Sequence, residues 1–125
     1  MIASVFGIAI GAILGANLRY LVMILLKSQT LPMELPMAIF VCNVSGSLLA
    51  GFFLMYSQQH EVSPLLFQSV SIGFLGSLTT FSSFAVDNFI LFEKSSLHSL
   101  LNIALHVITT WLAVMAGGQL CKRIL

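Results

Sequence analysis

Hydrophobic residues run through the chain in four long stretches, which are separated by short polar segments. The stretches cover residues 2–26, 35–56, 64–92 and 97–120. Each can cross the roughly 30 Å hydrocarbon core of a bilayer, which takes about 20 residues in helical form. The polar and apolar alternation of barrel strands is absent. The pattern therefore predicts an all-α membrane protein with four transmembrane helices in a single domain that spans the chain.

The composition excludes a water-soluble fold. Of the 125 residues, 58% are hydrophobic and 7% are charged, whereas soluble domains have about 45–50% apolar and about 25% charged residues. The polar joints are too short to hold a domain outside the membrane, so any function is expected within the bilayer. The first stretch lacks the basic head and the cleavage site of a signal peptide, and we expect it to be a mature helix.

Several function classes find no support in the residues. The net charge is +1 without a basic cluster, which predicts no nucleic-acid partner. Cys42 and Cys121 lack the paired spacing of a metal site or a disulfide framework, and buried thiols are expected. An enzyme would need a nucleophile with a base, or a metal cluster, and no carboxylate pairs with His106 in the sequence pattern.

The basic residues do not decide the orientation of the chain. With four spans, Lys27 and Lys94 lie on one side of the membrane, and Lys122 and Arg123 lie on the other side. The positive-inside rule therefore gives a tie. A chain that inserts both ways can form an antiparallel dimer with a two-fold axis in the membrane plane. The alternative is that one or two charges fix a single orientation.

Small residues predict close helix contacts. Gly7, Gly11 and Gly15 form a ridge of small residues on one face of the first stretch. Ser47 and Gly51 form a shorter ridge of the same kind in the second stretch. In lipid, such small-xxx-small ridges let two helix backbones approach closely. The ridge predicts a neighbouring helix without identifying it.

Two polar residues within the spans are candidate functional groups. Arg19 is costly at membrane depth unless it meets a partner or a water-filled cavity. It could snorkel, but helical side chains lean towards the N-terminus, which aims Arg19 at the bilayer middle. Asn43 offers donors and an acceptor. Its amide could join two helices or line a pore, and the sequence does not separate these roles.

The third stretch carries an unusual polar string at its centre, from Gly73 to Phe84. Two glycines followed by threonines and serines predict a helix break. Within the hydrocarbon region, non-helical backbone is stable only where it is buried in protein or lines a cavity. The carbonyls released by a break are suitable cation ligands. Phe81 and Phe84 share a helix face, and the positive ring edges could meet a dehydrated anion. Ordinary core packing is the alternative for both rings.

The fourth stretch has a polar stripe. Asn102, His106 and Thr110 recur every fourth residue and so lie on one side of a helix. The stripe is a candidate wall of a pathway, although His106 could also be a satisfied core histidine.

Three motifs together resemble the CrcB, or Fluc, family of fluoride channels. They are GAILGANLRY at 11–20, NVSG at 43–46 and GFLGSLTTFSSF at 73–84. The resemblance covers all four stretches. It implies an antiparallel, dual-topology homodimer in the bacterial inner membrane. The dimer would have two narrow fluoride pores, export cytoplasmic fluoride passively, and hold one structural sodium ion at its centre.

The resemblance also assigns roles to residues. The fluoride pore would be lined by Asn43, Phe81, Phe84, His106 and Thr110. The backbone carbonyls of Gly76 and Thr79 would bind sodium, and anions would be recruited in the vestibule by Arg19, Ser82 and Ser83. The chain departs from the commoner family pattern at Ser77, Ser83, Asp87 and Val114. The last two departures leave the far end of the polar track and the role of Asp87 open.

Two other assignments remain as alternatives. A small multidrug exporter also has four spans and dual insertion, but it needs a carboxylate in the first span, where the one charged residue is Arg19. The chain could also be one subunit of a heterodimeric fluoride channel. Because Arg19, Asn43 and both phenylalanines are present, we expect a homodimer.

Overall fold

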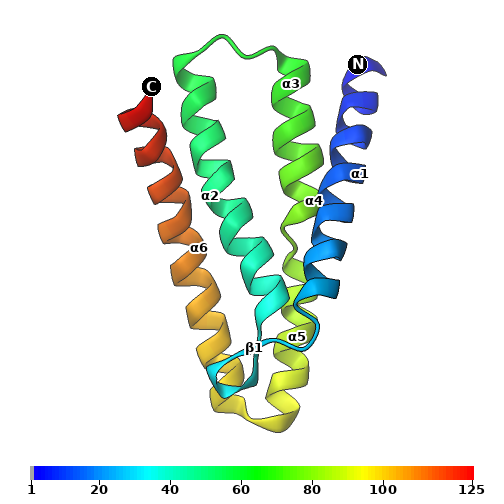
Figure 1. The fold of residues 1–125 in the computed structure, drawn as a ribbon, viewed down its shortest axis with the longest axis vertical. Coiled ribbons are helices and arrows are strands. Elements are labelled where there is room, and N and C mark those ends of the chain that lie inside the picture. The colour runs from blue at the N-terminus through cyan, green and yellow to red at the C-terminus, as the bar shows by residue number, and fades with distance from the viewer. Residues whose placement is uncertain (1) are drawn as a thin grey trace.

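The computed structural model describes residues 2–125, and in this part of the chain four helical segments are long and apolar enough to cross a membrane (Figure 1). The first is α1 (Ile2–Leu25) and the second is α2 (Met37–Gln59). The third segment, Pro64–Lys94, is divided into α3 (Pro64–Gln68), the π-helical η2 (Ser69–Leu75), α4 (Gly76–Leu78) and α5 (Phe81–Lys94). The fourth is α6 (Ser96–Ile124). The fold is therefore all-helical in its membrane-spanning parts.

Serine caps begin two of these helices. The Ser63 hydroxyl accepts a hydrogen bond from the Leu66 N–H at 3.2 Å, and Pro64 occupies the first helical position, where its missing N–H is harmless. Ser95 caps α6 in the same way through the N–H of His98, at 3.4 Å. These caps satisfy backbone donors at the points where the chain turns back towards the membrane.

A short hairpin joins α1 to α2. Strand β1 (Thr30–Leu31) pairs antiparallel with β2 (Leu35–Pro36), and η1 (Pro32–Glu34), a 3₁₀ turn, connects them. Sequence reasoning expected only a polar joint here. An exposed ion pair at 3.3 Å connects Glu34 to Lys94 at the end of α5. Because both side chains are solvated, the pair adds little stability, but it shows that the two joints lie at the same end of the bundle.

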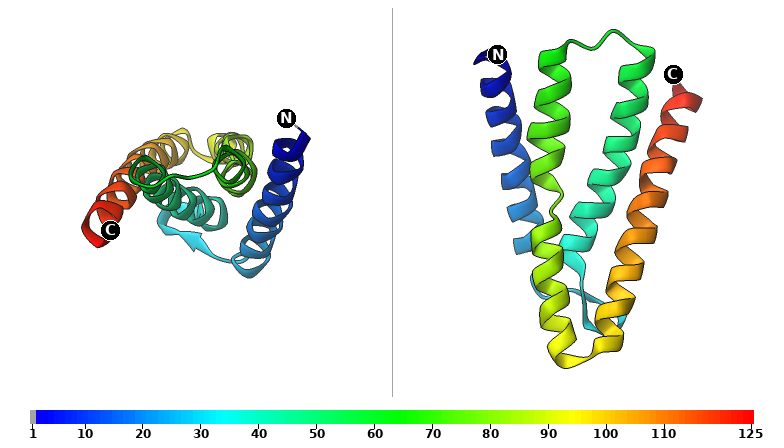
Figure 2. Two further views of the ribbon diagram at one scale, coloured as in Figure 1. Left: turned by 90° about the horizontal axis from the view of Figure 1, so that it is seen from above. Right: turned by 180° about the vertical axis from the view of Figure 1, so that it is seen from behind.

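Helix α1 lies beside the third span (Figure 2), and its glycine ridge forms the contact. A Cβ atom built on Gly11 would lie 2.2 Å from the carbonyl oxygen of Ser69, and one on Gly15 would lie 2.1 Å from that of Phe74. Only glycine permits backbones this close. The predicted neighbour of the ridge is thus confirmed and is identified as η2 and α4.

A second close pair is formed by α2 and α6. A Cβ atom on Gly51 would lie 2.0 Å from the Val114 carbonyl oxygen, and one on Gly117 would lie 2.0 Å from that of Leu48. The protein is thus built from two tight helix pairs, α1 with the third span and α2 with α6.

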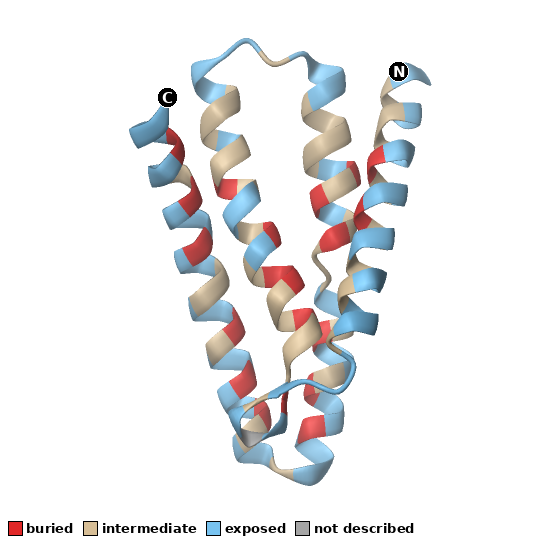
Figure 3. Cartoon of the chain, viewed as in Figure 1, coloured by how far each residue is buried: buried red, intermediate tan, exposed pale blue. Residues whose placement is uncertain are grey.

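The outer faces of the helices are apolar and exposed, while the buried positions face the neighbouring helices (Figure 3). Large exposed side chains include Ile10, Phe89 and Trp111. A surface of this kind is stable in lipid and not in water. The chain is a multi-pass membrane protein.

Candidate functional site

The third span is broken between α4 and α5. Thr79 and Thr80 have extended backbone angles, with φ −85° and ψ 145° at Thr79 and φ −147° and ψ 122° at Thr80. Thr80 then caps α5, because its Oγ1 accepts the N–H of Ser83 at 3.3 Å. The helix break predicted within residues 73–84 is confirmed and lies at the two threonines.

Asn43 of α2 holds the broken backbone. Its Oδ1 accepts the N–H of Thr80 at 2.9 Å, and its Nδ2 donates to the carbonyl of the same residue at 3.3 Å. One amide thus pairs with both backbone groups of Thr80, and the N–H is the one that the break removes from the helical ladder. A side-chain amide carries two donor hydrogens, so the second Nδ2 hydrogen of Asn43 is not used by Thr80.

The break also leaves carbonyls in the preceding turn without their usual helical donors, among them those of Gly76 and Thr79. In a continuous helix the Thr80 N–H would donate to Gly76 and the Ser83 N–H would donate to Thr79. Here the first N–H donates to Asn43 and the second to the Thr80 hydroxyl. The Gly76 and Thr79 carbonyl oxygens are therefore available as ligands.

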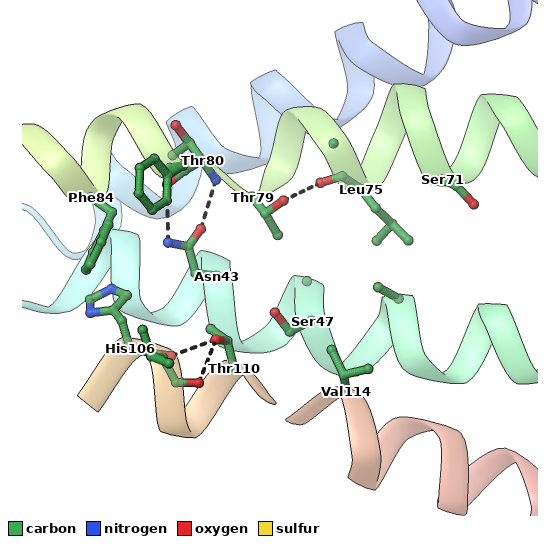
Figure 4. A pocket seen from close by; sticks show the side chains of 15 residues that line it. Asn43, Ser47, Ser71, Leu75, Thr79, Thr80, Phe84, His106, Thr110 and Val114 are labelled. Atoms are coloured by element: carbon green, nitrogen blue, oxygen red, sulfur yellow. Dashed lines mark hydrogen bonds between the residues drawn. The ribbon is translucent and has the colours of Figure 1, made fainter. Parts of the chain in front are cut away.

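A groove of about 420 Å³ lies beside the break, between α2, the third span and α6 (Figure 4). It contains the predicted pore residues together with the two residues that bear the free carbonyls. The residues from the sequence prediction that line it are Asn43, Gly76, Thr79, Phe81, Phe84, His106 and Thr110. The structure thus brings together groups from three separate helical segments.

Aromatic rings form one wall of the groove. The ring centroids of Phe81 and Phe84 are 5.5 Å apart, and Phe84 is 4.6 Å from the imidazole of His106. Phe40 meets the same imidazole edge-on at 5.2 Å. Phe84 is buried, with 8% of its surface exposed, whereas Phe81 is 80% exposed at the groove edge. The two phenylalanines therefore have different surroundings in the single chain.

The hydroxyl groups of the groove donate to backbone carbonyls. Thr79 donates to the carbonyl of Leu75 at 2.9 Å, and Thr110 donates to that of His106 at 2.6 Å. His106 Nδ1 lies 3.1 Å from the carbonyl oxygen of Asn102, so Nδ1 carries a hydrogen. Its buried Nε2 has no hydrogen-bond partner among residues 2–125. A buried, unpaired imidazole nitrogen thus belongs to a residue of the groove wall, and the groove hydroxyls can rotate.

The three predicted vestibule residues do not line the groove. Arg19 is half-buried on α1. The exposed Ser82 has its hydroxyl 3.0 Å from that of Thr80, and the hydroxyl of Ser83 accepts from Thr80 at 3.4 Å. Asp87 is half-buried one helical turn further along α5. Both serines therefore surround the cap of α5, beside the groove.

Sequence reasoning missed several polar residues at the site: Ser47, Ser71 and Thr80 line the groove, and a further one lies next to it. Asn88 of α5 is buried and donates to the carbonyl of Phe84 at 2.8 Å. Asn102, which the sequence placed on the wall of a pathway, is fully buried behind the groove and donates to Asn88. The signal that could have found Asn88 is its spacing of four residues from Phe84, which puts both on one helix face.

These features define a class of protein: a multi-pass membrane protein with a polar and aromatic groove at a helix broken at membrane depth. The family model described as CrcB-like protein, Camphor Resistance (CrcB), matches residues 6–118. The chain therefore belongs to the CrcB family.

Curated relatives agree over nearly the whole chain. A protein of Campylobacter jejuni named fluoride-specific ion channel FluC is 36% identical over 123 residues, which cover 98% of this chain and all of the relative. A protein of the same name from Shewanella halifaxensis is 34% identical over 118 residues, or 94% of each chain. A third, from Methylococcus capsulatus, is 37% identical over 97% of this chain and 54% of its own length.

Proposed function

We propose that this protein is a fluoride-selective channel that lets cytoplasmic fluoride leave the cell passively, down its electrochemical gradient. The observation that carries the proposal is the groove at the helix break, in which an amide, hydroxyls and aromatic edges converge at membrane depth. Family membership and the names of the curated relatives support the same function. A channel of this kind is not an enzyme and needs no energy source.

The groove offers replacements for the water that a fluoride ion loses. The second Nδ2 hydrogen of Asn43 can donate to the anion. The hydroxyl of Thr110 can rotate away from the His106 carbonyl and donate instead. The edges of Phe81 and Phe84 carry partial positive charge and can contact an anion directly. A narrow fit between these groups would disfavour chloride, which is larger.

The polar and aromatic groups point to an assembly of two chains. Phe81 is 80% exposed at the edge of the groove, and Gly76, with its free carbonyl, is also exposed. A second copy would cover both residues and close the groove into a pore. The tie between basic residues at the two ends supports antiparallel insertion and a dual-topology homodimer. The bacterial sources of the relatives favour the inner membrane as its location.

The same break fits a structural sodium ion. Sodium prefers neutral oxygen ligands, and the carbonyls of Gly76 and Thr79 have lost their helical donors. In an antiparallel dimer with its axis at the break, two chains would supply four such oxygens. A bound cation would hold the two breaks together and offset the cost of unpaired carbonyls in the membrane.

Arg19, Ser82 and Ser83 would attract anions before they enter the pore. Arg19 supplies positive charge on α1, and both serines lie beside the exposed side of the α5 cap. Of the alternatives, the multidrug exporter would need a carboxylate in α1, where none occurs. A heterodimer remains the second possibility, in which an unlike subunit supplies the other half of the pore.

The direct test is fluoride efflux from liposomes that contain the purified protein, followed with a fluoride electrode, with chloride-loaded vesicles as the control. We expect rapid loss of fluoride without loss of chloride. No fluoride loss from vesicles with well-folded protein would contradict a homodimeric channel, and adding a candidate partner chain would then separate the heterodimer from an incorrect function.

The aromatic wall gives a second test. We expect Phe81→Ile or Phe84→Ile to abolish or strongly slow fluoride efflux while the protein still assembles, because an aliphatic side chain has no positive edge. Phe89→Ile is the matched control, since Phe89 lies on the exposed face of α5 outside the groove. Wild-type efflux from both pore variants would show that the rings do not line the pathway.

A further inference from the structure

A continuous chain of hydrogen bonds runs behind the groove, between α5 and α6. Asn88 donates to the carbonyl of Phe84 at 2.8 Å, and Asn102 donates to Asn88 Oδ1 at 3.0 Å. Ser99 donates to the backbone carbonyl of Asn88 at 3.1 Å. His106 Nδ1 donates to the carbonyl of Asn102 at 3.1 Å. The first and last of these bonds go to backbone carbonyls one turn back on the same helix, and the Asn102–Asn88 side-chain bond connects the part of α5 that carries Phe84 to the part of α6 that carries His106.

Neither asparagine lines the groove itself. Asn88 is 7% exposed and Asn102 is 0% exposed. Asn102 Oδ1 has no hydrogen-bond partner among residues 2–125, and an unpaired buried acceptor costs about 1–3 kcal/mol. An apolar pair of similar size would avoid this cost, so stability alone does not account for two amides at these positions.

We propose that Asn88 and Asn102 are positioning residues, which hold Phe84 against His106 and thereby set how strongly the pore excludes anions larger than fluoride. The proposal rests on the fluoride-channel function proposed above. The asparagine pair is a direct side-chain bond between α5 and α6 that fixes their register next to the ring contact of 4.6 Å. Because hydrogen bonds restrict both distance and angle, they fix this register more narrowly than apolar contact does.

The selectivity for fluoride over larger anions is the property that should change when the asparagine bond is removed. A small anion is held by a wall that cannot move outward, and a wall that yields by a fraction of an ångström accepts a larger anion. Without the asparagine bond, Phe84 and His106 would still be buried, but their separation would be set by packing and by the one remaining bond, from Ser99 to the Asn88 backbone carbonyl. The expected result is a channel that remains folded and conducts fluoride less selectively.

The test compares a double variant, Asn88→Leu with Asn102→Leu, with the wild-type protein in liposomes. Leucine has the same number of side-chain heavy atoms and the same branching as asparagine, and removing both partners together leaves neither one unpaired. We expect an unchanged oligomeric state and thermal transition, with a ratio of fluoride to chloride efflux that is roughly tenfold or more lower, in line with the sensitivity of sites to small displacements. Asn17→Leu is the matched control, because Asn17 bonds only to its own helix, at Ile13, and its ratio should stay at the wild-type value.

A folded double variant with the wild-type ratio would overturn the proposal, because a purely structural role predicts that result. If the double variant does not fold, Asn88→Ser takes its place. A serine hydroxyl can still donate to the Phe84 carbonyl one turn back but cannot reach Asn102. The ratio should again fall, and a wild-type ratio would overturn the proposal. Wild-type vesicles that release no fluoride would overturn both this inference and the proposed function.

Discussion

Replacing Asn43 by alanine should destabilise the protein through the backbone of one other residue. Asn43 is the partner of both the N–H and the carbonyl of Thr80. The break prevents the Thr80 N–H from forming a regular helical bond, so the variant leaves this donor without a protein partner, whereas the Thr80 carbonyl can still accept the first bond of α5. Each buried unpaired group costs about 1–3 kcal/mol. Because Thr80 borders the groove and water can reach it, we expect the lower part of this range, about 1–2 kcal/mol.

The measurement is reversible unfolding in mixed detergent micelles, followed by circular dichroism at a helix band. Asn17→Ala serves as the control, because it also removes an asparagine amide from a spanning helix but from an exposed position that bonds only to Ile13. Its free energy of unfolding should change by less than about 0.5 kcal/mol. Asn43→Asp keeps the acceptor for the Thr80 N–H but places a carboxylate against the Thr80 carbonyl. It should therefore lower the free energy of unfolding at least as much as Asn43→Ala does.

The reasoning would be refuted if Asn43→Ala unfolded within about 0.5 kcal/mol of the wild type. That result would mean that the break at Thr80 is held by the rest of the fold, and that the Asn43 amide is free for an anion alone. If Asn43→Ala lost fluoride efflux without losing stability, this would also indicate that Asn43 acts in the pore and does not hold the break. The two measurements together therefore separate the structural role of Asn43 from its role in the pore.

Three further predictions concern packing, capping and surface charge. Gly117→Ala should destabilise the protein by about 1–3 kcal/mol in the same unfolding assay, because the added Cβ would lie 2.0 Å from the Leu48 carbonyl oxygen. Gly118→Ala is the control: its added Cβ would have its nearest contact at 3.6 Å, so the substitution should be neutral or stabilising. Thr80→Val should lower the free energy of unfolding by about 1 kcal/mol, because the valine side chain cannot cap α5. A variant as stable as the wild type would show that the cap is dispensable. Glu34→Gln should change stability by less than about 1 kcal/mol, because its ion pair is exposed; a larger loss would mean that the pair anchors the hairpin.

The four spans could be predicted from the sequence because lipid imposes a minimum length and an apolar composition on any helix that crosses it. The break was also predictable, but its position was not. The prediction rested on two glycines and the threonines and serines that follow them, but Gly73 serves packing, since a Cβ on Gly73 would lie 2.5 Å from the Ile8 carbonyl oxygen. The break lies instead at Thr79 and Thr80, where the Asn43 amide and the threonine cap pair the released backbone groups.

The candidate site was predicted only in part, because side-chain roles depend on which helices meet. Asn43 could have been a contact between helices or a pore donor, and only the position of Thr80 shows that the first role is filled. The four-residue spacing in the fourth span predicted that Asn102 and His106 lie on one helix face. It could not predict that Asn102 bonds to Asn88, because Asn88 belongs to another helix. The homodimer, its orientation and the sodium ion stay predictions.

The pairing of the helices has a consequence for how the chain is made. The close glycine contacts join the first span to the third and the second to the fourth, so each tight pair skips one helix in the order of synthesis. A nascent chain with only two spans in the membrane has neither pair. Assembly must therefore wait until the third span has left the ribosome, and premature termination before that point leaves two helices without their partners, as a substrate for membrane proteases.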